Sequence, residues 1–153
     1  MEKKRINIFF IIRLLVGAVF LVSGAEKLLS PYQNFLYVVQ GYSLFLPFFE
    51  ELTARIFPWI EFILGIFTVL GLNLFWSLRG ILFCLVGFIL IISQAILRNL
   101  PIEECGCFGS LVSVPITVTL VFDSCLFLLT LWMVINVSKT SFWGLDQIFQ
   151  KDG

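Results

Sequence analysis

Two cysteines separated by one glycine are the residues of this chain best suited to chemistry. They are Cys105 and Cys107, with Gly106 between them and Glu103 and Glu104 directly before them. A disulfide between cysteines this close forms a small strained ring, and glycine best tolerates the tight backbone that such a ring requires. Strained, exposed disulfides have high reduction potentials and exchange readily. In an oxidising compartment, the spacing therefore predicts a pair that performs thiol–disulfide exchange.

Two other interpretations of the same pair stay open. A disulfide between Cys105 and Cys107 could simply hold its loop in place, or the two thiolates could bind a soft metal ion such as Cu(I) or Zn(II). A closed zinc site needs about four ligands, and the chain contains no histidine that could supply the others. The absence of histidine also excludes imidazole general bases and histidine-ligated haem. We therefore predict no resident metal site.

Membrane-spanning helices are the elements that must position the cysteine pair. Of the 153 residues, 59% are hydrophobic and 13% are charged, whereas about a quarter of the residues in a soluble domain are charged. A helix needs roughly 20 apolar residues to cross the hydrocarbon core. Four stretches satisfy this requirement: about 6–29, 52–72, 75–97 and 114–137. We therefore predict an all-α integral membrane protein, a single four-helix domain over residues 1–153.

The connections and the charges predict how this bundle lies in the membrane. Segment 31–51 is rich in aromatic residues, so we expect it at the membrane interface between the first two spans. Lysine and arginine favour the cytoplasmic side of a membrane. The side that carries both termini holds six of them, and the opposite side holds three, Lys27, Arg55 and Arg98. This difference predicts cytoplasmic termini in a bacterial inner membrane, with the loop 98–113 facing the periplasm.

Ionisable residues inside the spans form a second group of candidates, because charges in a membrane are costly and mark functional sites. At about 1.5 Å per residue, Glu61 and Asp123 each lie roughly 10–15 Å below the outer surface, where they are candidates for proton handling. Arg13, Lys27 and Arg98 are their expected charge partners. The simpler interpretation is a set of ion pairs that fixes helix packing. In either case we predict that both carboxylates point into the bundle, toward basic or hydroxyl groups.

The sequence resembles the DoxX-like membrane proteins, and specifically the MauE (methylamine utilisation) family. The most specific shared element is the run Cys-Gly-Cys-Phe-Gly at residues 105–109, between the third and fourth spans. The other shared positions are those of one face of the first span and of a Pro-x-x-Glu motif in the second: Arg13, Gly17, Phe20, Gly24, Lys27, Pro58 and Glu61. The resemblance covers nearly the whole chain. It implies a redox-associated protein that helps to mature the disulfide-rich small subunit of methylamine dehydrogenase.

The resemblance also implies a partner, the periplasmic thioredoxin-like protein MauD. Four-helix disulfide-generating enzymes of the DsbB and vitamin K epoxide reductase type use Cys-x-x-Cys together with a second external pair, whereas this chain has Cys-x-Cys and no second external pair. A relay within the chain is therefore excluded, and a partner thiol protein or a different mechanism is needed. No cofactor motif is evident. A bound quinone stays open as an alternative, but no residue pattern supports it.

Three functions remain open at this point. The leading hypothesis is a membrane protein that exchanges thiols and disulfides with a periplasmic thioredoxin-like partner and so supports disulfide formation or maturation of exported proteins. The second is a non-enzymatic subunit or assembly factor of a larger membrane complex, with a structural loop disulfide. The third is a small transporter for a soft metal ion or another solute. The net charge of zero and the lack of a basic run argue against nucleic acid as a partner.

Overall fold

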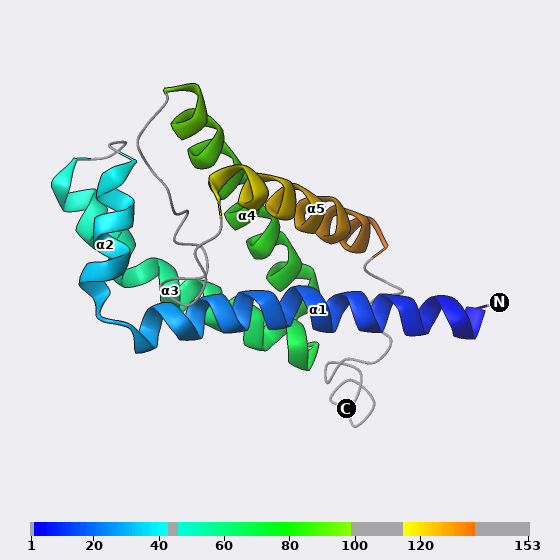
Figure 1. The fold of residues 1–153 in the computed structure, drawn as a ribbon. Helices are drawn as coiled ribbons and strands as arrows, with labels where there is room; N and C mark the ends of the chain where they lie inside the picture. The colour runs from blue at the N-terminus through cyan, green and yellow to red at the C-terminus, as the bar shows by residue number, and fades with distance from the viewer. Residues whose placement is uncertain (1, 43–45, 99–114, 137–153) are drawn as a thin grey trace.

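The computed structural model describes residues 2–42, 46–98 and 115–136, and these ranges are built of helices. In chain order the helices are α1 (Glu2–Leu29), α2 (Tyr32–Gly41), α3 (Pro47–Leu70), α4 (Leu74–Leu97) and α5 (Ile116–Ile135) (Figure 1). Within the described ranges, α1 from Ile8 onward, α3, α4 and α5 are long and apolar enough to cross a membrane. The prediction of an all-α membrane bundle is confirmed.

The observed helices differ from the predicted spans mainly at the start of α3. This helix begins at Pro47, whereas the predicted span begins near residue 52. Proline is favoured in the first turn of a helix because it has no N–H to leave unpaired and its fixed φ angle suits the helix. Residues 47–51 therefore belong to α3, and α2 is the separate helix between the first two spans.

A tight turn joins α3 to α4. Gly71 has a φ angle of 71°, a left-handed conformation that glycine adopts without steric cost. The N–H of Leu72 donates to the carbonyl of Phe67 at 2.9 Å, and the N–H of Gly71 donates to the carbonyl of Thr68 at 3.3 Å. These two bonds form a Schellman motif, which ends a helix while satisfying its last carbonyls. The hydroxyls of Thr68 and Ser77 then hydrogen-bond across the two helices.

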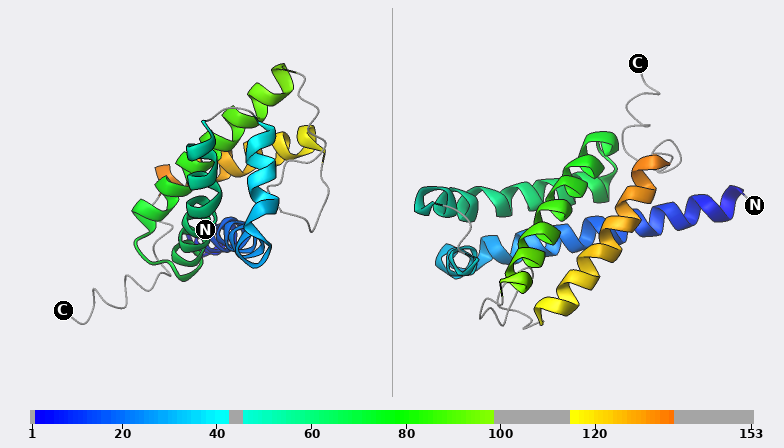
Figure 2. Two further views of the ribbon diagram at one scale, coloured as in Figure 1. Left: turned by 90° about the vertical axis from the view of Figure 1, so that its left-hand side faces the viewer. Right: turned by 90° about the horizontal axis from the view of Figure 1, so that it is seen from above.

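Helices α1 and α3 lie side by side and antiparallel (Figures 1 and 2). Glycines allow their close approach. A Cβ atom added at Gly24 would lie 2.6 Å from the backbone nitrogen of Phe62, and one added at Gly65 would lie 2.5 Å from the backbone nitrogen of Leu21. Small residues at membrane helix interfaces bring backbones into van der Waals contact. The α1–α3 pair is therefore held by direct backbone packing.

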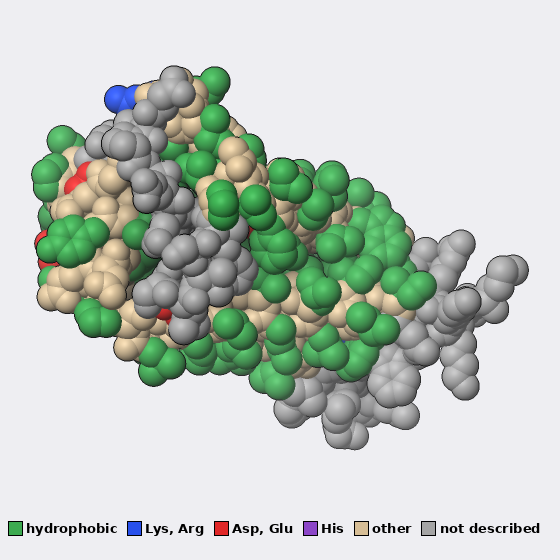
Figure 3. Space-filling model, in the orientation of Figure 1, with side chains coloured by type: hydrophobic (Ala, Val, Ile, Leu, Met, Phe, Trp, Pro, Cys, Tyr) green, Lys and Arg blue, Asp and Glu red, His purple; other side chains and the backbone are tan. Residues whose placement is uncertain are grey.

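Helices α4 and α5 form a second antiparallel pair, which crosses α1 (Figure 2). The core between the two pairs includes Val16 and Phe20 of α1, Leu78 and Leu85 of α4, and Leu126 of α5. Many large apolar side chains point outward instead and cover the visible face of the bundle (Figure 3). Such an apolar exterior is what helices in contact with lipid present.

Candidate functional site

A buried ion pair between α1 and α3 is the centre of the candidate site. The ammonium group of Lys27 lies 2.7 Å from Oε2 of Glu61, and the two side chains are 1% and 2% exposed. Lys27 also donates a hydrogen bond of 2.7 Å to the hydroxyl of Ser23, one helical turn earlier. The predicted pairing of Glu61 with a basic residue inside the bundle is therefore present, and Ser23 adds a hydroxyl to it.

The close approach of the two helices explains why this pair forms. Gly24 precedes Lys27 by one turn and Gly65 follows Glu61 by one turn, and these glycines allow the backbones to meet. Aromatic rings from other helices complete the surroundings of the ammonium group. Its nitrogen lies 5.3 Å from the ring centre of Phe35 in α2 and 5.7 Å from that of Phe88 in α4, within the range of cation–π attraction. Lys27 is thus held by α2, α3 and α4 together.

Asp123 of α5 lies next to the ion pair. Its side chain is buried, and Lys27 and Glu61 are the charged groups that act on it. Asp123, Glu61 and Ser23 share the wall of a small cavity of about 20 Å³, which is enough for the centre of one water molecule. In the part of the chain that the structure describes, Oδ2 of Asp123 receives no hydrogen bond. The arrangement offers a carboxylate beside a water-sized space, next to a fixed ion pair.

Tyr42, directly after α2, is a site residue that the sequence pattern does not reveal. Its side chain is buried, and its burial together with the negative charge of Asp123 raises the pKa of its phenol to about 12. The sequence places Tyr42 in an aromatic segment expected at the membrane interface, and nothing local links it to the fourth span. Ser23, by contrast, was detectable, because it lies four residues before Lys27 on the same helix face.

The structure leaves two of the predicted charge partners away from this cluster. Arg13 is buried, with its guanidinium group 5.0 Å from the ring centre of Phe10, and it lies 14 residues before Lys27, about 21 Å along α1. Arg98 is exposed at the end of α4, and among the described residues it forms no ion pair with Glu61 or Asp123. The described cluster therefore consists of Lys27, Glu61 and Asp123, with Ser23 and Tyr42 beside them. We name these five residues the charge cluster.

The predicted redox pair lies elsewhere in the chain. Cys105 and Cys107 fall outside the described residues, between Arg98 at the end of α4 and Pro115 at the start of α5. The two cysteines that the structure does describe are single thiols, Cys84 buried and Cys125 exposed. Across the described ranges there is no group of three or more cysteine, aspartate or glutamate side chains placed to hold a metal ion.

Comparison with known proteins gives one match. The family model described as "Methylamine utilisation protein MauE" matches residues 5–136, a range that contains all five helices except the first residues of α1. No curated protein and no solved structure matches the chain. The wider resemblance to DoxX-like proteins stays a prediction.

Proposed function

This chain belongs to the MauE family, which associates it with methylamine utilisation, and we propose that it is a multi-pass membrane protein of thiol–disulfide exchange. In this proposal Cys105 and Cys107 react with a thioredoxin-like protein in the periplasm, and the exchange supports disulfide formation or maturation of exported proteins. The termini lie in the cytoplasm and the cysteine loop lies outside the inner membrane, in accordance with the distribution of lysine and arginine.

The atoms and electrons of the exchange reaction balance between the cysteine pair and its partner, so no further oxidant is needed. A thiolate of the reduced partner attacks one sulfur of the Cys105–Cys107 disulfide, forming a mixed disulfide and releasing the other sulfur as a thiolate, which takes up a proton. The partner's second thiol then loses its proton and attacks the mixed disulfide. The products are the Cys105–Cys107 dithiol and an oxidised partner, so two electrons and two protons have passed to the pair. The reverse sequence oxidises the pair when the partner arrives as a disulfide.

The observation that supports this proposal is that Oδ2 of Asp123 accepts no hydrogen bond from the described residues. Each exchange takes up and releases protons, and a side chain that can give and take a proton accelerates such steps. Glu61 is fixed by the ammonium group of Lys27, whereas Oδ2 of Asp123 receives no hydrogen bond from the described residues and the side chain borders a water-sized cavity. Asp123 follows Pro115 by eight residues, about 12 Å along α5 from the end of the cysteine loop. This position supports Asp123 as the proton carrier, with Lys27 and Glu61 as its fixed electrostatic surroundings.

The second candidate function is a non-enzymatic assembly factor, and the Lys27–Glu61 pair favours it. This pair lies in the tightest helix contact and would stabilise the bundle without any turnover. In that case Cys105 and Cys107 form a permanent bridge. The two functions therefore differ in the reduction potential of the cysteine pair.

A redox titration of the purified full-length chain tests the proposal. The protein is equilibrated in glutathione buffers of graded potential, alkylated, and analysed by mass spectrometry for the state of Cys105 and Cys107. An exchanging pair should become reduced at potentials above about −300 mV, whereas a structural disulfide stays oxidised down to that potential. A pair that stays oxidised there would reject exchange and support the assembly factor.

The role of Asp123 needs a kinetic measurement. In Asp123→Asn the rate of disulfide reduction by a bacterial thioredoxin should fall by about 100-fold, the lower range for loss of a general acid–base group. Ser124→Ala is the matched control, because the neighbouring Ser124 hydroxyl donates to the carbonyl of Leu120 in its own helix at 2.7 Å. Equal rates in Asp123→Asn and Ser124→Ala would remove Asp123 from the mechanism and leave the exchange itself intact.

A further inference from the structure

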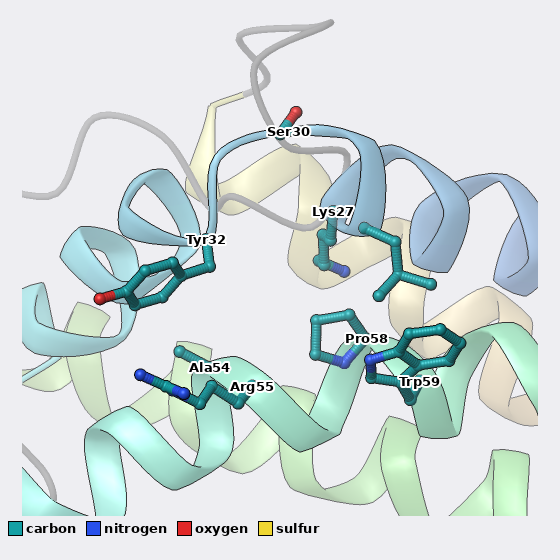
Figure 4. A pocket seen from close by; sticks show the side chains of 8 residues that line it. Lys27, Ser30, Tyr32, Ala54, Arg55, Pro58 and Trp59 are labelled. Atoms are coloured by element: carbon teal, nitrogen blue, oxygen red, sulfur yellow. The ribbon is translucent and has the colours of Figure 1, made fainter.

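An open pocket separates the end of α1 and the start of α2 from α3, and we infer that it binds the headgroup of an anionic phospholipid. The pocket has a volume of about 410 Å³, which falls in the usual size range of ligand sites. Figure 4 shows Lys27 and Tyr32 on one side of it and Ala54, Arg55, Pro58 and Trp59 of α3 on the other. This inference is independent of the chemistry at Cys105 and Cys107.

The charged side chains that line the pocket are both cations. The side chain of Lys27 is 1% exposed and already donates to Ser23 and Glu61, so Arg55 is the cation that a ligand in the pocket can reach. The guanidinium group of Arg55 pairs at 2.8 Å with Glu51, one turn earlier, and this pair is 61% and 52% exposed. An ion pair as exposed as this one is weak. A phosphate can therefore compete with Glu51 for the guanidinium group of Arg55. Guanidinium groups bind phosphates through two parallel hydrogen bonds.

Aromatic and apolar groups form the rest of the wall. Trp59 is 56% exposed and Tyr32 is 41% exposed, and the guanidinium carbon of Arg55 lies 5.2 Å from the ring centre of Tyr32. Tryptophan and tyrosine prefer the boundary between headgroups and hydrocarbon. Lys27 lies in the last turn of α1, which places the pocket at an end of that span. The pocket thus combines cations with the aromatic residues typical of the headgroup level.

The mouth of the pocket adjoins lipid-facing surface, and this feature selects a lipid over a free anion. Leu29 beside it is 88% exposed, and Ile56 and Ile63 of α3 are 47% and 46% exposed. Acyl chains attached to a headgroup in the pocket can therefore lie against apolar side chains, whereas inorganic phosphate gains nothing from them. Basic pockets between transmembrane helices on the cytoplasmic side of membranes bind anionic headgroups. The same charge pairing is expected at this end of the bundle, which the distribution of lysine and arginine places on the periplasmic side.

The backbone of α3 adds a hydrogen-bond acceptor. Pro58 lies inside the helix and has no N–H, so the carbonyl of Ala54, four residues earlier, receives no helical hydrogen bond from that position. Ala54 and Pro58 both line the pocket. A headgroup that carries hydroxyl donors as well as a phosphate matches this set of groups, and phosphatidylglycerol has both.

Native mass spectrometry of the full-length chain in detergent tests the inference, with phosphatidylglycerol and phosphatidylcholine of identical acyl chains as probes. We expect tighter retention of phosphatidylglycerol, and Arg55→Gln should lower its affinity by about five-fold, the effect of one basic group near the headgroups. Arg79→Gln is the matched control, because Arg79 is exposed on α4 and stacks on Phe75 instead, 3.7 Å from the ring centre. It should leave the affinity unchanged.

Glu51→Gln tests the competition directly. Loss of this carboxylate frees the guanidinium group of Arg55 and removes a repulsive charge, so binding of phosphatidylglycerol should strengthen. Three results would each overturn the inference: equal retention of the two lipids, equal losses in Arg55→Gln and Arg79→Gln, or displacement of the lipid by millimolar inorganic phosphate. Thermal unfolding of each variant in phosphatidylcholine vesicles confirms that the fold is retained.

Discussion

Lys27 of α1 and Glu61 of α3 form a 2.7 Å ion pair one helical turn from the glycines at which the two backbones meet. Gly24 and Gly65 each lie so close to the opposite helix that an added Cβ would come within 2.6 Å of a backbone atom. The tight contact and the buried charges therefore depend on each other. A substitution that disturbs the helix contact should also disturb the ion pair, and the reverse.

The first prediction concerns the ion pair. Lys27→Met or Glu61→Gln should each lower the free energy of unfolding by about 3–5 kcal/mol. The reason is that the remaining ionisable side chain stays buried without its opposite charge. The double variant Lys27→Met/Glu61→Leu should recover most of this loss. Chemical unfolding in mixed micelles gives the three values. The exposed pair Arg55–Glu51 is the control, and its removal should cost less than about 1 kcal/mol; single-variant losses this small at Lys27 or Glu61 would contradict the prediction.

The second prediction concerns the glycines of α1 and α3. Gly24→Ala and Gly65→Ala should each destabilise the protein by about 1–3 kcal/mol, since the added methyl group pushes the helix backbones apart. Gly87→Ala provides the matched control inside α4, because a Cβ there meets nothing within 4 Å. That change should stabilise the helix by about 0.5–1 kcal/mol. Thermal unfolding distinguishes the two cases, and similar effects at all three glycines would refute direct backbone packing.

The third prediction concerns pH. The pKa of Tyr42 is raised from 10.0 to about 12 by burial and by Asp123, so the folded state favours the neutral phenol. The stability that Tyr42 contributes is therefore full below pH 10 and is lost as the pH rises from 10 toward 12. In Tyr42→Phe the unfolding temperature should fall less steeply between pH 9 and 11.5 than in the parent protein. The same slope in both proteins would show that Tyr42 is not shielded in this way.

Part of this pH effect should depend on Asp123. Asp123→Asn removes the negative charge that acts on Tyr42, so its phenol should ionise at lower pH than in the parent chain. Ultraviolet absorbance of phenolate, compared between Asp123→Asn and Asp123→Asn/Tyr42→Phe, isolates the Tyr42 transition. An unchanged transition would mean that burial alone sets this pKa.

The fourth prediction concerns the orientation of the cysteine loop. In a Cys84→Ala/Cys125→Ala background, a membrane-impermeant maleimide should label Cys105 or Cys107 in reduced cells whose outer membrane has been permeabilised. The positive residues near the termini motivate this expectation. Labelling that appears only after the inner membrane is lysed would reverse the topology and remove the proposed contact with a periplasmic partner.

The residue pattern by itself determined the helical spans and the faces that carry polar groups. Apolar runs of sufficient length define the spans, and Lys27, Gly24 and Ser23 share one face of α1 through helical spacing. The expectation that Glu61 points inward to a basic partner follows from the cost of charge in lipid. These features are local or depend on the membrane as a solvent, so they are readable without a structure.

Which of these faces meet was decided only by the tertiary structure. Three basic residues were candidate partners for the carboxylates, and the structure selects Lys27 because glycines bring α1 and α3 into contact at its level. The approach of Tyr42 to Asp123 joins the end of α2 to the middle of α5, and no periodicity relates two helices so far apart in the sequence. Helical spacing specifies directions around one axis, whereas the contact between two axes depends on how the side chains of both fit together.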